Sequence, residues 1–139
     1  MASVDEIDGK ILEILRKDAR ITNDNIARQV GLTEGAVRNR IKRLIQNETI
    51  KKFTIETEHH QAEAVVLIKT ETKASKEVLK KIRKYSNRLF ETAGQFDVAA
   101  FIEAGSIEEI NTAVDRLRAI NGVASTITLI KIADERLLD

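Results

Sequence analysis

Apolar residues recur every three or four positions through the first third of the chain, a spacing typical of amphipathic helices. We predict a helix over residues 4–18, a second helix that begins at Thr22 or Asn23, and a third helix that follows Thr33 and ends near Gln46. Hydroxyl and amide side chains such as these commonly cap helix starts. The positions expected to face the interior are Ile7, Ile11, Leu12, Ile14, Leu15, Ile26, Ala27, Val30, Val37, Ile41, Leu44 and Ile45.

The second and third predicted helices are separated by a tight turn. Gly31 can take the left-handed conformation that ends a helix, and Leu32 fills the corner. We interpret residues 22–46 as a helix-turn-helix whose second helix enters the major groove of DNA. The alternative is an ordinary helical hairpin with a solvated basic face, but the apolar spacing favours helices that cross steeply. The residues expected to face outward are Glu34, Gly35, Arg38, Asn39 and Lys42.

Residues 49–56 carry apolar side chains with lysines between them, and we predict a short hairpin or wing packed on the three helices. Lys51 and Lys52 would then either contact the DNA backbone or lie on a solvated strand edge. The sequence leaves both interpretations open.

A polar stretch follows, and we place the domain boundary there. The predicted division is a DNA-binding domain at 1–56, a linker at 57–63 and a second domain at 64–139. His59 and His60 are interpreted as linker residues and not as metal ligands, because nothing in the spacing makes the neighbouring glutamates converge on one ion.

The second domain has a different rhythm, in which apolar runs alternate with amphipathic helices in the order β-α-β-β-α-β. That order predicts an α+β fold, the ferredoxin-like sandwich, with two helices over one four-stranded antiparallel sheet. The predicted strands are residues 64–70, 89–93, 98–104 and about 123–132, and the predicted helices are residues 75–85 and 106–120. The second of these helices is expected to bury Ile107, Ile110, Val114 and Leu117.

A sheet covered by helices on one side leaves its other face bare. The runs at 65–68 and 98–102 are apolar throughout, so both faces of the sheet require burial. A second copy packed across the bare face would supply this burial. We therefore predict a homodimer through the second domain, which can assemble further.

The net charge of the chain is only +1, but the basic residues are unevenly distributed. Between Arg28 and Lys52 there are seven basic and two acidic residues, so this stretch has a net charge of +5. From Gln61 onward, twelve basic and twelve acidic residues cancel. A polyanion such as double-stranded DNA would therefore be drawn to the first domain.

The composition excludes several kinds of chemistry. The chain has no cysteine, which rules out disulfides, thiol catalysis and cysteine-based zinc sites. No acid/base set, nucleophile with a base, or phosphate loop is recognisable, so we expect neither an enzyme nor a cofactor. No apolar run approaches the ~20 residues of a membrane span, and we expect a cytoplasmic protein.

Six stretches carry a further signal: Val4–Leu12, Asp18–Ile21, Ile26–Thr33, Val37–Leu44, Ile50–Phe53 and Gly94–Asp97. In this order, with a winged helix-turn-helix followed by β-α-β-β-α-β, they resemble the Lrp/AsnC (leucine-responsive/asparagine, or feast/famine) family of transcription regulators. The Gly94–Asp97 turn is similar to that family's Gly-x-x-Asp element. Two features depart from expectation: Gly9 lies inside the first helix, and the linker lacks the proline that the family often has.

The resemblance implies that the second domain binds an amino acid and builds dimers and octamers, with the effector between dimers. An α-amino acid is a zwitterion, which needs hydroxyl or backbone N–H groups for its carboxylate and an acceptor such as Asp97 for its ammonium. The alternative is a plain hairpin turn, with threonines present only for their strand propensity. The residues that the resemblance assigns to the effector are Gly94, Gln95, Phe96, Asp97, Thr126 and Thr128.

For DNA, we expect Arg38 to pair with guanine and Asn39 with adenine. Basic residues of the third helix and the wing would contact phosphates, and polar residues at helix starts would add further contacts. The base-edge set is Glu34, Gly35, Arg38 and Asn39, the phosphate set is Arg40, Lys42, Arg43, Lys51 and Lys52, and the helix-start set is Thr22, Asn23 and Thr33.

These features predict a sequence-specific transcription regulator that responds to a small amino acid. The alternative is an oligomeric architectural DNA-binding protein without ligand sensing. Binding of an amino acid distinguishes the two.

Overall fold

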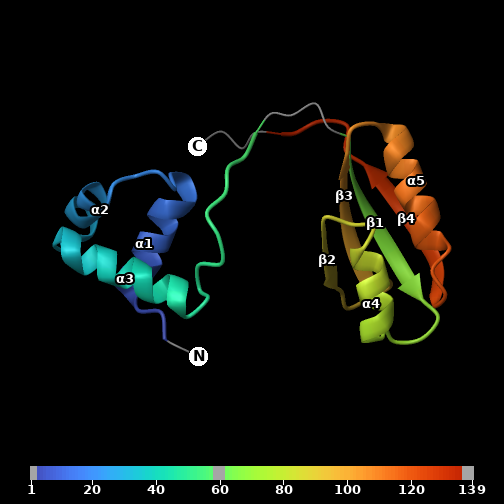
Figure 1. Ribbon diagram of the computed structural model, residues 1–139, viewed down its shortest axis with the longest axis horizontal. Coiled ribbons are helices and arrows are strands. Elements are labelled where there is room, and N and C mark those ends of the chain that lie inside the picture. The colour runs from blue at the N-terminus through green and yellow to red at the C-terminus, as the bar shows by residue number, and fades with distance from the viewer. Residues whose placement is uncertain (1–2, 58–61, 136–139) are drawn as a thin grey trace. The chain divides into compact units, whose positions relative to one another are not determined.

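The computed structural model describes residues 3–57 and 62–135. The chain divides into two compact units, Met1–Thr57 and Glu58–Asp139 (Figure 1). The first contains α1 (Glu6–Lys17), α2 (Asn23–Val30) and α3 (Glu34–Gln46). The second contains β1 (Ala62–Thr70), α4 (Lys76–Arg83), β2 (Arg88–Glu91), β3 (Val98–Ala104), α5 (Ile107–Arg118) and β4 (Val123–Ile130). The helix-turn-helix and the ferredoxin-like order are confirmed.

Side-chain caps set the helix starts of the first unit. The carboxylate of Asp5 accepts the N–H of Asp8 at 2.8 Å, and the carboxylate of Asp8 accepts the N–H of Asp5 at 3.2 Å, which forms a capping box. The hydroxyls of Thr22 and Thr33 each accept, at 3.2 Å, the backbone N–H three residues further on. Gly31 ends α2 with a φ of 72°, as the sequence predicted.

The core of the first unit is small and aliphatic. Ile11, Ile26 and Val37 are completely buried where α1, α2 and α3 meet. Leu44 is buried as expected, but Ile45 beside it is 47% exposed, so its predicted burial is wrong. The other two helices cover only a narrow face of α3, and the buried residues Val37 and Leu44 occupy that face.

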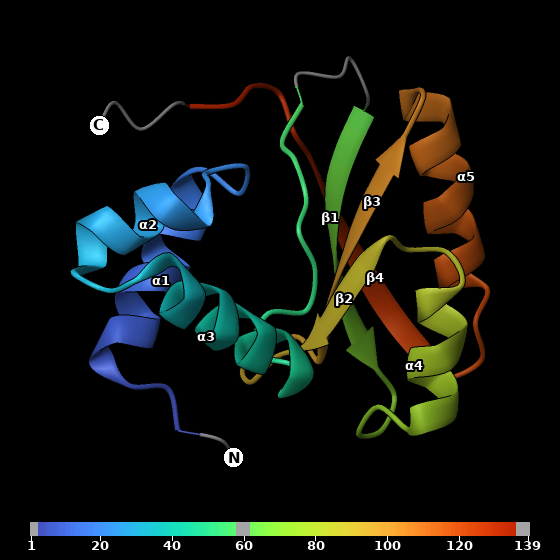
Figure 2. The same cartoon turned by 60° about the vertical axis from the view of Figure 1, so that its left-hand side comes forward.

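The sheet of the second unit is antiparallel, with strand order β2-β3-β1-β4. Helices α4 and α5 cover one of its faces (Figure 2). Val66 and Ile68 of the central strand are completely buried there, together with Ile110 and Leu117 of α5. Ile107 is 50% exposed at the first position of α5, so its predicted burial is wrong.

The opposite face of the sheet carries apolar side chains without helical cover. Val65 lies opposite Phe101 and Leu129, and Leu67 lies opposite Ile127, so these side chains share one face. The most exposed large apolar side chains of this bare face are Phe90 (43%), Ile127 (49%) and Leu129 (54%).

The predicted wing is wrong. Residues 51–57 have no regular secondary structure, and Ile55 is 77% exposed. Short hairpin turns favour glycine, asparagine and aspartate, and residues 49–56 contain none of the three.

Three strands have boundaries that differ from the prediction, and β2 spans Arg88–Glu91 and not residues 89–93. β1 begins at Ala62, inside the predicted linker, and β4 ends at Ile130 and not near Ile132. Ile130 pairs with Ala64 near the start of β1, so little partner strand remains beyond it, and Ile132 is 99% exposed. Within the described ranges, no helix is both long enough and apolar enough to cross a membrane.

Candidate DNA-binding surface and effector turn

The turn between α2 and α3 is closed by backbone hydrogen bonds. The N–H groups of Gly31 and Leu32 both donate to the carbonyl of Ala27, at 2.9 and 3.1 Å. Because α3 buries Val37 and Leu44 on its inner side, its other side faces solvent. A helix anchored along one side and open along the other has the geometry required to enter a DNA groove.

Two predicted base-edge residues, Glu34 and Arg38, form an ion pair along α3. Nη2 of Arg38 lies 2.5 and 2.6 Å from the two carboxylate oxygens of Glu34, and the arginine side chain is 65% exposed. Such an exposed pair is worth only about 0.3–0.5 kcal/mol, so a DNA base can compete for the guanidinium. Next to them, a Cβ at Gly35 would meet no heavy atom within 4 Å.

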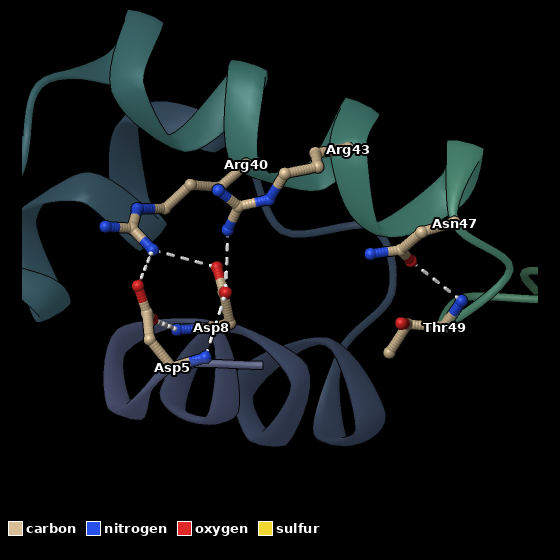
Figure 3. Close-up of polar contacts among 6 residues, drawn as sticks. All are labelled: Asp5, Asp8, Arg40, Arg43, Asn47 and Thr49. Atoms are coloured by element: carbon tan, nitrogen blue, oxygen red, sulfur yellow. Dashed lines mark hydrogen bonds and ion pairs between the residues drawn. The ribbon is translucent and has the colours of Figure 1, made fainter. Parts of the chain in front are cut away.

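Arg40 and Arg43 turn toward α1 (Figure 3). Nη1 of Arg40 lies 2.6 Å from Oδ2 of Asp5 and 2.9 Å from Oδ1 of Asp8. Nη2 of Arg43 lies 2.7 Å from Oδ2 of Asp8. The Asp8 side chain is completely buried, whereas those of Arg40 and Arg43 are 23% and 51% exposed. These four residues, which we name the α1–α3 ion cluster, hold the third helix against the first.

Within the α1–α3 ion cluster, the charged forms of Asp5 and Arg40 are favoured. The hydrogen bond from Arg40, followed by the backbone N–H of Asp8, lowers the pKa of the Asp5 carboxyl. In return, the hydrogen bonds to Asp5 and Asp8 raise the pKa of Arg40. The predicted phosphate contacts of Arg40 and Arg43 stay predictions, because both side chains already have partners within the domain.

Sequence reasoning missed Asp8. Two signals could have identified it: the Asp-x-x-Asp spacing from Asp5, which suits a capping box, and its position three residues before the buried Ile11 on the same helical face.

The remaining predicted phosphate contacts are open to solvent. Lys42, Lys51 and Lys52 are exposed, and in the described part of the chain no carboxylate oxygen lies within 4.0 Å of their ammonium groups. Asn23 occupies the first position of α2, beside the capping hydroxyl of Thr22. These positions agree with contact to a polyanion.

In the second unit, Asp97 ties the turn between β2 and β3 to the end of β1. Its Oδ2 accepts the backbone N–H of Thr70 at 2.8 Å and the hydroxyl of Thr70 at 3.0 Å. These hydrogen bonds, with a smaller contribution from the charge of Lys69, lower the pKa of Asp97. The carboxylate is therefore held in its charged form in a fixed position.

The rest of this turn is also held by its own chain. Gly94 has a φ of 121°, a conformation that strongly favours glycine. The hydroxyl of Thr92 donates to the carbonyl of Phe96 at 2.7 Å, and Nζ of Lys69 donates to the carbonyl of Gln95 at 3.1 Å. The four predicted effector residues of the turn are thus brought together as one ordered loop.

Thr126 and Thr128 do not join that loop within one chain. Both threonines pair with residues of β1 whose side chains face the helices. In the sheet, β1 and β3 lie between β4 and β2. Nε of Arg118 on α5 donates to Oγ1 of Thr126 at 3.0 Å. Oγ1 of Thr128 is buried and has no hydrogen-bond partner among residues 3–57 and 62–135. Two strand spacings, about 10 Å, separate β4 from the strand that leaves the turn.

Across the residues that the structure describes, no group of three or more histidine, aspartate or glutamate side chains is placed to hold a metal ion. His59 and His60, which were interpreted as linker residues, lie outside those described residues.

The first unit defines a helix-turn-helix DNA-binding protein, and the second adds a ferredoxin-like domain to it. Residues 4–45 match the AsnC-type helix-turn-helix domain. The chain is 42% identical over 130 residues to the HTH-type transcriptional regulator LysM of Sulfurisphaera tokodaii, covering 91% of this chain and 93% of that protein. The chain belongs to the Lrp/AsnC family of transcription regulators.

Two solved structures have the same fold. The first is Escherichia coli AsnC, with a TM-score of 0.78, 19% identity, and coverage of 99% of this chain and 97% of that one. The second is the feast or famine regulatory protein of M. tuberculosis complexed with L-methionine, with a TM-score of 0.81, 19% identity, and coverage of 97% and 96%.

Proposed function

We propose that this regulator binds specific DNA sequences through the outer face of α3. The observation that carries the proposal is the division of that helix into two sides. Its inner side is fixed by the buried core and by Asp8, whereas Gly35, Arg38 and Asn39 stay accessible on its outer side. A fixed helix that offers a guanidinium and an amide on one turn can read guanine and adenine edges in the major groove.

Replacing Arg38 by alanine tests this proposal. We expect the variant to lose about 1–3 kcal/mol of binding free energy on the preferred sequence, because one bidentate base contact disappears. The preferred sequence is first selected from a randomised duplex pool with the wild-type protein. Affinities for that sequence and a scrambled duplex are then measured by fluorescence anisotropy.

Arg28→Ala is the matched control. Arg28 is also an exposed arginine in an ion pair one turn along a helix, 2.8 Å from Asp24 on α2, but it lies outside the proposed contact set. The control should keep the ratio of affinities for the selected and scrambled duplexes. If Arg38→Ala keeps that ratio as well, α3 is not the reading helix.

We further propose that the Gly94–Asp97 turn takes part in binding an amino acid effector. Support comes from the charged, fixed carboxylate of Asp97, which can accept an α-ammonium group, and from the methionine complex of the structurally similar mycobacterial protein. Thr126 and Thr128 lie about two strand spacings across the sheet from the turn, and we propose that the pocket they share with it is built from different copies of the chain.

Isothermal titration calorimetry with a panel of the twenty amino acids tests the sensing proposal. Saturable heat with one or a few of them, lost in Asp97→Ala, supports it. Absence of heat with all twenty favours the alternative of an architectural DNA-binding protein whose second domain only assembles.

We also propose that the bare face of the sheet joins two copies into a homodimer, from which octamers can be built. The support is the set of apolar side chains that are 43–54% exposed on Phe90, Ile127 and Leu129. Such a contiguous apolar face is typical of a surface that another protein covers.

A further inference from the structure

The second domain carries a concentration of positive charge that its zero net charge conceals. From Lys73 to Arg88 there are seven basic residues and one acidic residue, Glu77. All seven basic side chains are exposed. The average over the second half hides this stretch because acidic residues elsewhere in the half balance it.

Some of the positive charges on helix α4 do not stabilise the helix itself. Lys76, Lys80 and Lys84 follow one another at intervals of four residues, which places like charges on neighbouring turns of one face. Lys76 also occupies the first position of the helix, where the helix dipole disfavours a cation. The helix dipole therefore accounts for basic residues in the last turn but not for the whole row.

The basic residues at the end of α4 meet another from α5. Lys81, Lys84 and Arg116 line a hollow of about 420 Å³ between the C-terminal ends of the two helices, with Tyr85 between them. Nζ of Lys84 and Cζ of Arg116 each lie 5.7 Å from the centre of the Tyr85 ring. None of the described residues that line this hollow is acidic.

These cations differ from the arginines of α3 in having no carboxylate partners. Within the described residues, no carboxylate oxygen lies within 4.0 Å of the side-chain nitrogens of Lys81, Lys84 or Arg116. On α3, by contrast, Arg38 and Arg40 are each paired with a carboxylate. A phosphate can therefore bind Lys81, Lys84 and Arg116 without breaking an internal ion pair.

We propose that the α4 basic surface, defined as Lys76, Lys80, Lys81, Lys84 and Arg116, binds the phosphate backbone of duplex DNA. This inference rests on the proposed DNA binding by α3, because DNA held by the first domain turns contact with a second site on the same chain into an intramolecular step. The second contact is independent of sequence, because separate lysines meet phosphates and not base edges.

The dependence of DNA affinity on salt measures this contact. The test variant is the triple substitution Lys81→Gln, Lys84→Gln and Arg116→Gln, and the probe is a random-sequence duplex of about 60 base pairs. Each lost phosphate contact lowers the slope of log K against log[NaCl] by about 0.9, so the slope should become shallower by about 2–3 per bound chain. The affinity near 0.1 M salt should fall more than about tenfold, because the lost phosphate contacts also lower the affinity itself.

The charge-retaining triple Lys81→Arg, Lys84→Arg and Arg116→Lys is the control and should keep the wild-type slope. Circular dichroism is used to check that both triple variants are folded. An unchanged slope in the glutamine triple overturns the proposal, and it does so even if the glutamine triple abolishes binding of inorganic triphosphate, because the hollow would then be a small-anion site.

The proposed function fails by a different result. If the wild-type protein does not bind the 60-base-pair duplex at 50 mM NaCl, DNA binding itself is absent. If the wild-type protein binds and Arg38→Ala relaxes sequence preference while the glutamine triple keeps the slope, only the second contact is overturned.

Discussion

Gly9 lies in the interior of α1 without a packing reason. Gly9 is exposed, and among the described residues a Cβ added at this position would meet no heavy atom within 4 Å. Glycine in a helix interior costs about 1 kcal/mol relative to alanine. We expect Gly9→Ala to raise the free energy of unfolding of the first domain by about 0.5–1 kcal/mol, measured by urea denaturation followed by helix circular dichroism.

Gly35→Ala is the matched comparison, because a Cβ there also meets nothing within 4 Å. Both substitutions should stabilise a helix, but only Gly35→Ala should weaken binding to the selected duplex, since the extra methyl group lies on the face that approaches the DNA. Equal affinities of both variants would show that the backbone of α3 does not approach the groove at Gly35.

At the residue scale, local chemistry was predictable and the extent of burial was not. The caps at Thr22 and Thr33 and the left-handed Gly31 follow from side-chain type, and the structure has all three. Ile45 and Ile107 fit the helical period yet are about half exposed. Periodicity identifies a face of a helix but not where the covering surface ends.

At the scale of elements, the α1–α3 ion cluster fixes the candidate reading helix. Replacing Asp8 by asparagine removes the charge that Arg40 and Arg43 share and leaves one amide oxygen for two guanidinium groups. We expect the first domain to lose about 2 kcal/mol of unfolding free energy, less than for a fully buried pair because both arginines reach water. Urea denaturation measures the loss.

Asp24→Asn provides the control for that measurement, because Asp24 lies in the same domain. Asp24 is 59% exposed and lies 2.8 Å from Arg28, so loss of its charge should change stability by less than about 1 kcal/mol. A similarly small effect of Asp8→Asn would mean that the core alone holds α3 in place.

The turn that Asp97 anchors should respond to acid. The folded-state pKa of Asp97 is lowered, so its contribution to stability is fully present above its unfolded pKa and is lost as the pH falls below about 4. Tyr85, the single tyrosine, reports unfolding of the second domain by fluorescence. Asp97→Asn cannot titrate, and its unfolding free energy should fall less between pH 5 and pH 3 than that of the wild type; an equal fall would assign the acid sensitivity to other carboxylates.

Elements with a core-facing period were predictable, whereas pairing over long distances was not. The order of helices and strands in the second domain follows from its apolar runs, and only strand ends such as Ile130 moved. The division of the α3 arginines depends on Asp8, which is 32 residues from Arg40. Nothing near Arg40 in the sequence indicates which side of α3 faces a carboxylate from another helix.

At the scale of the whole molecule, the amino-acid site could be predicted only through family resemblance. One strand, β1, lies between the strand that follows Asp97 and the strand that carries Thr128, so no local sequence pattern joins the two residues. The exposed sheet face, in contrast, could be predicted from strands that are apolar on both sides, and the structure leaves Ile127 and Leu129 about half exposed there. The proposed assembly would link the two, because a site shared between copies forms only when those copies meet.

Leu129→Lys tests that assembly. Leu129 is 54% exposed on the bare face, opposite Val65, and a lysine there would bring an unpaired charge into the interface. We expect the dimer to weaken by about 3 kcal/mol, roughly a hundredfold in Kd, measured by sedimentation equilibrium at micromolar protein. Ile107→Lys is the control, because Ile107 is 50% exposed but lies on α5, away from that face, and its variant should keep the wild-type mass. A wild-type protein that sediments as a single chain at this concentration would leave the apolar face without the partner proposed for it.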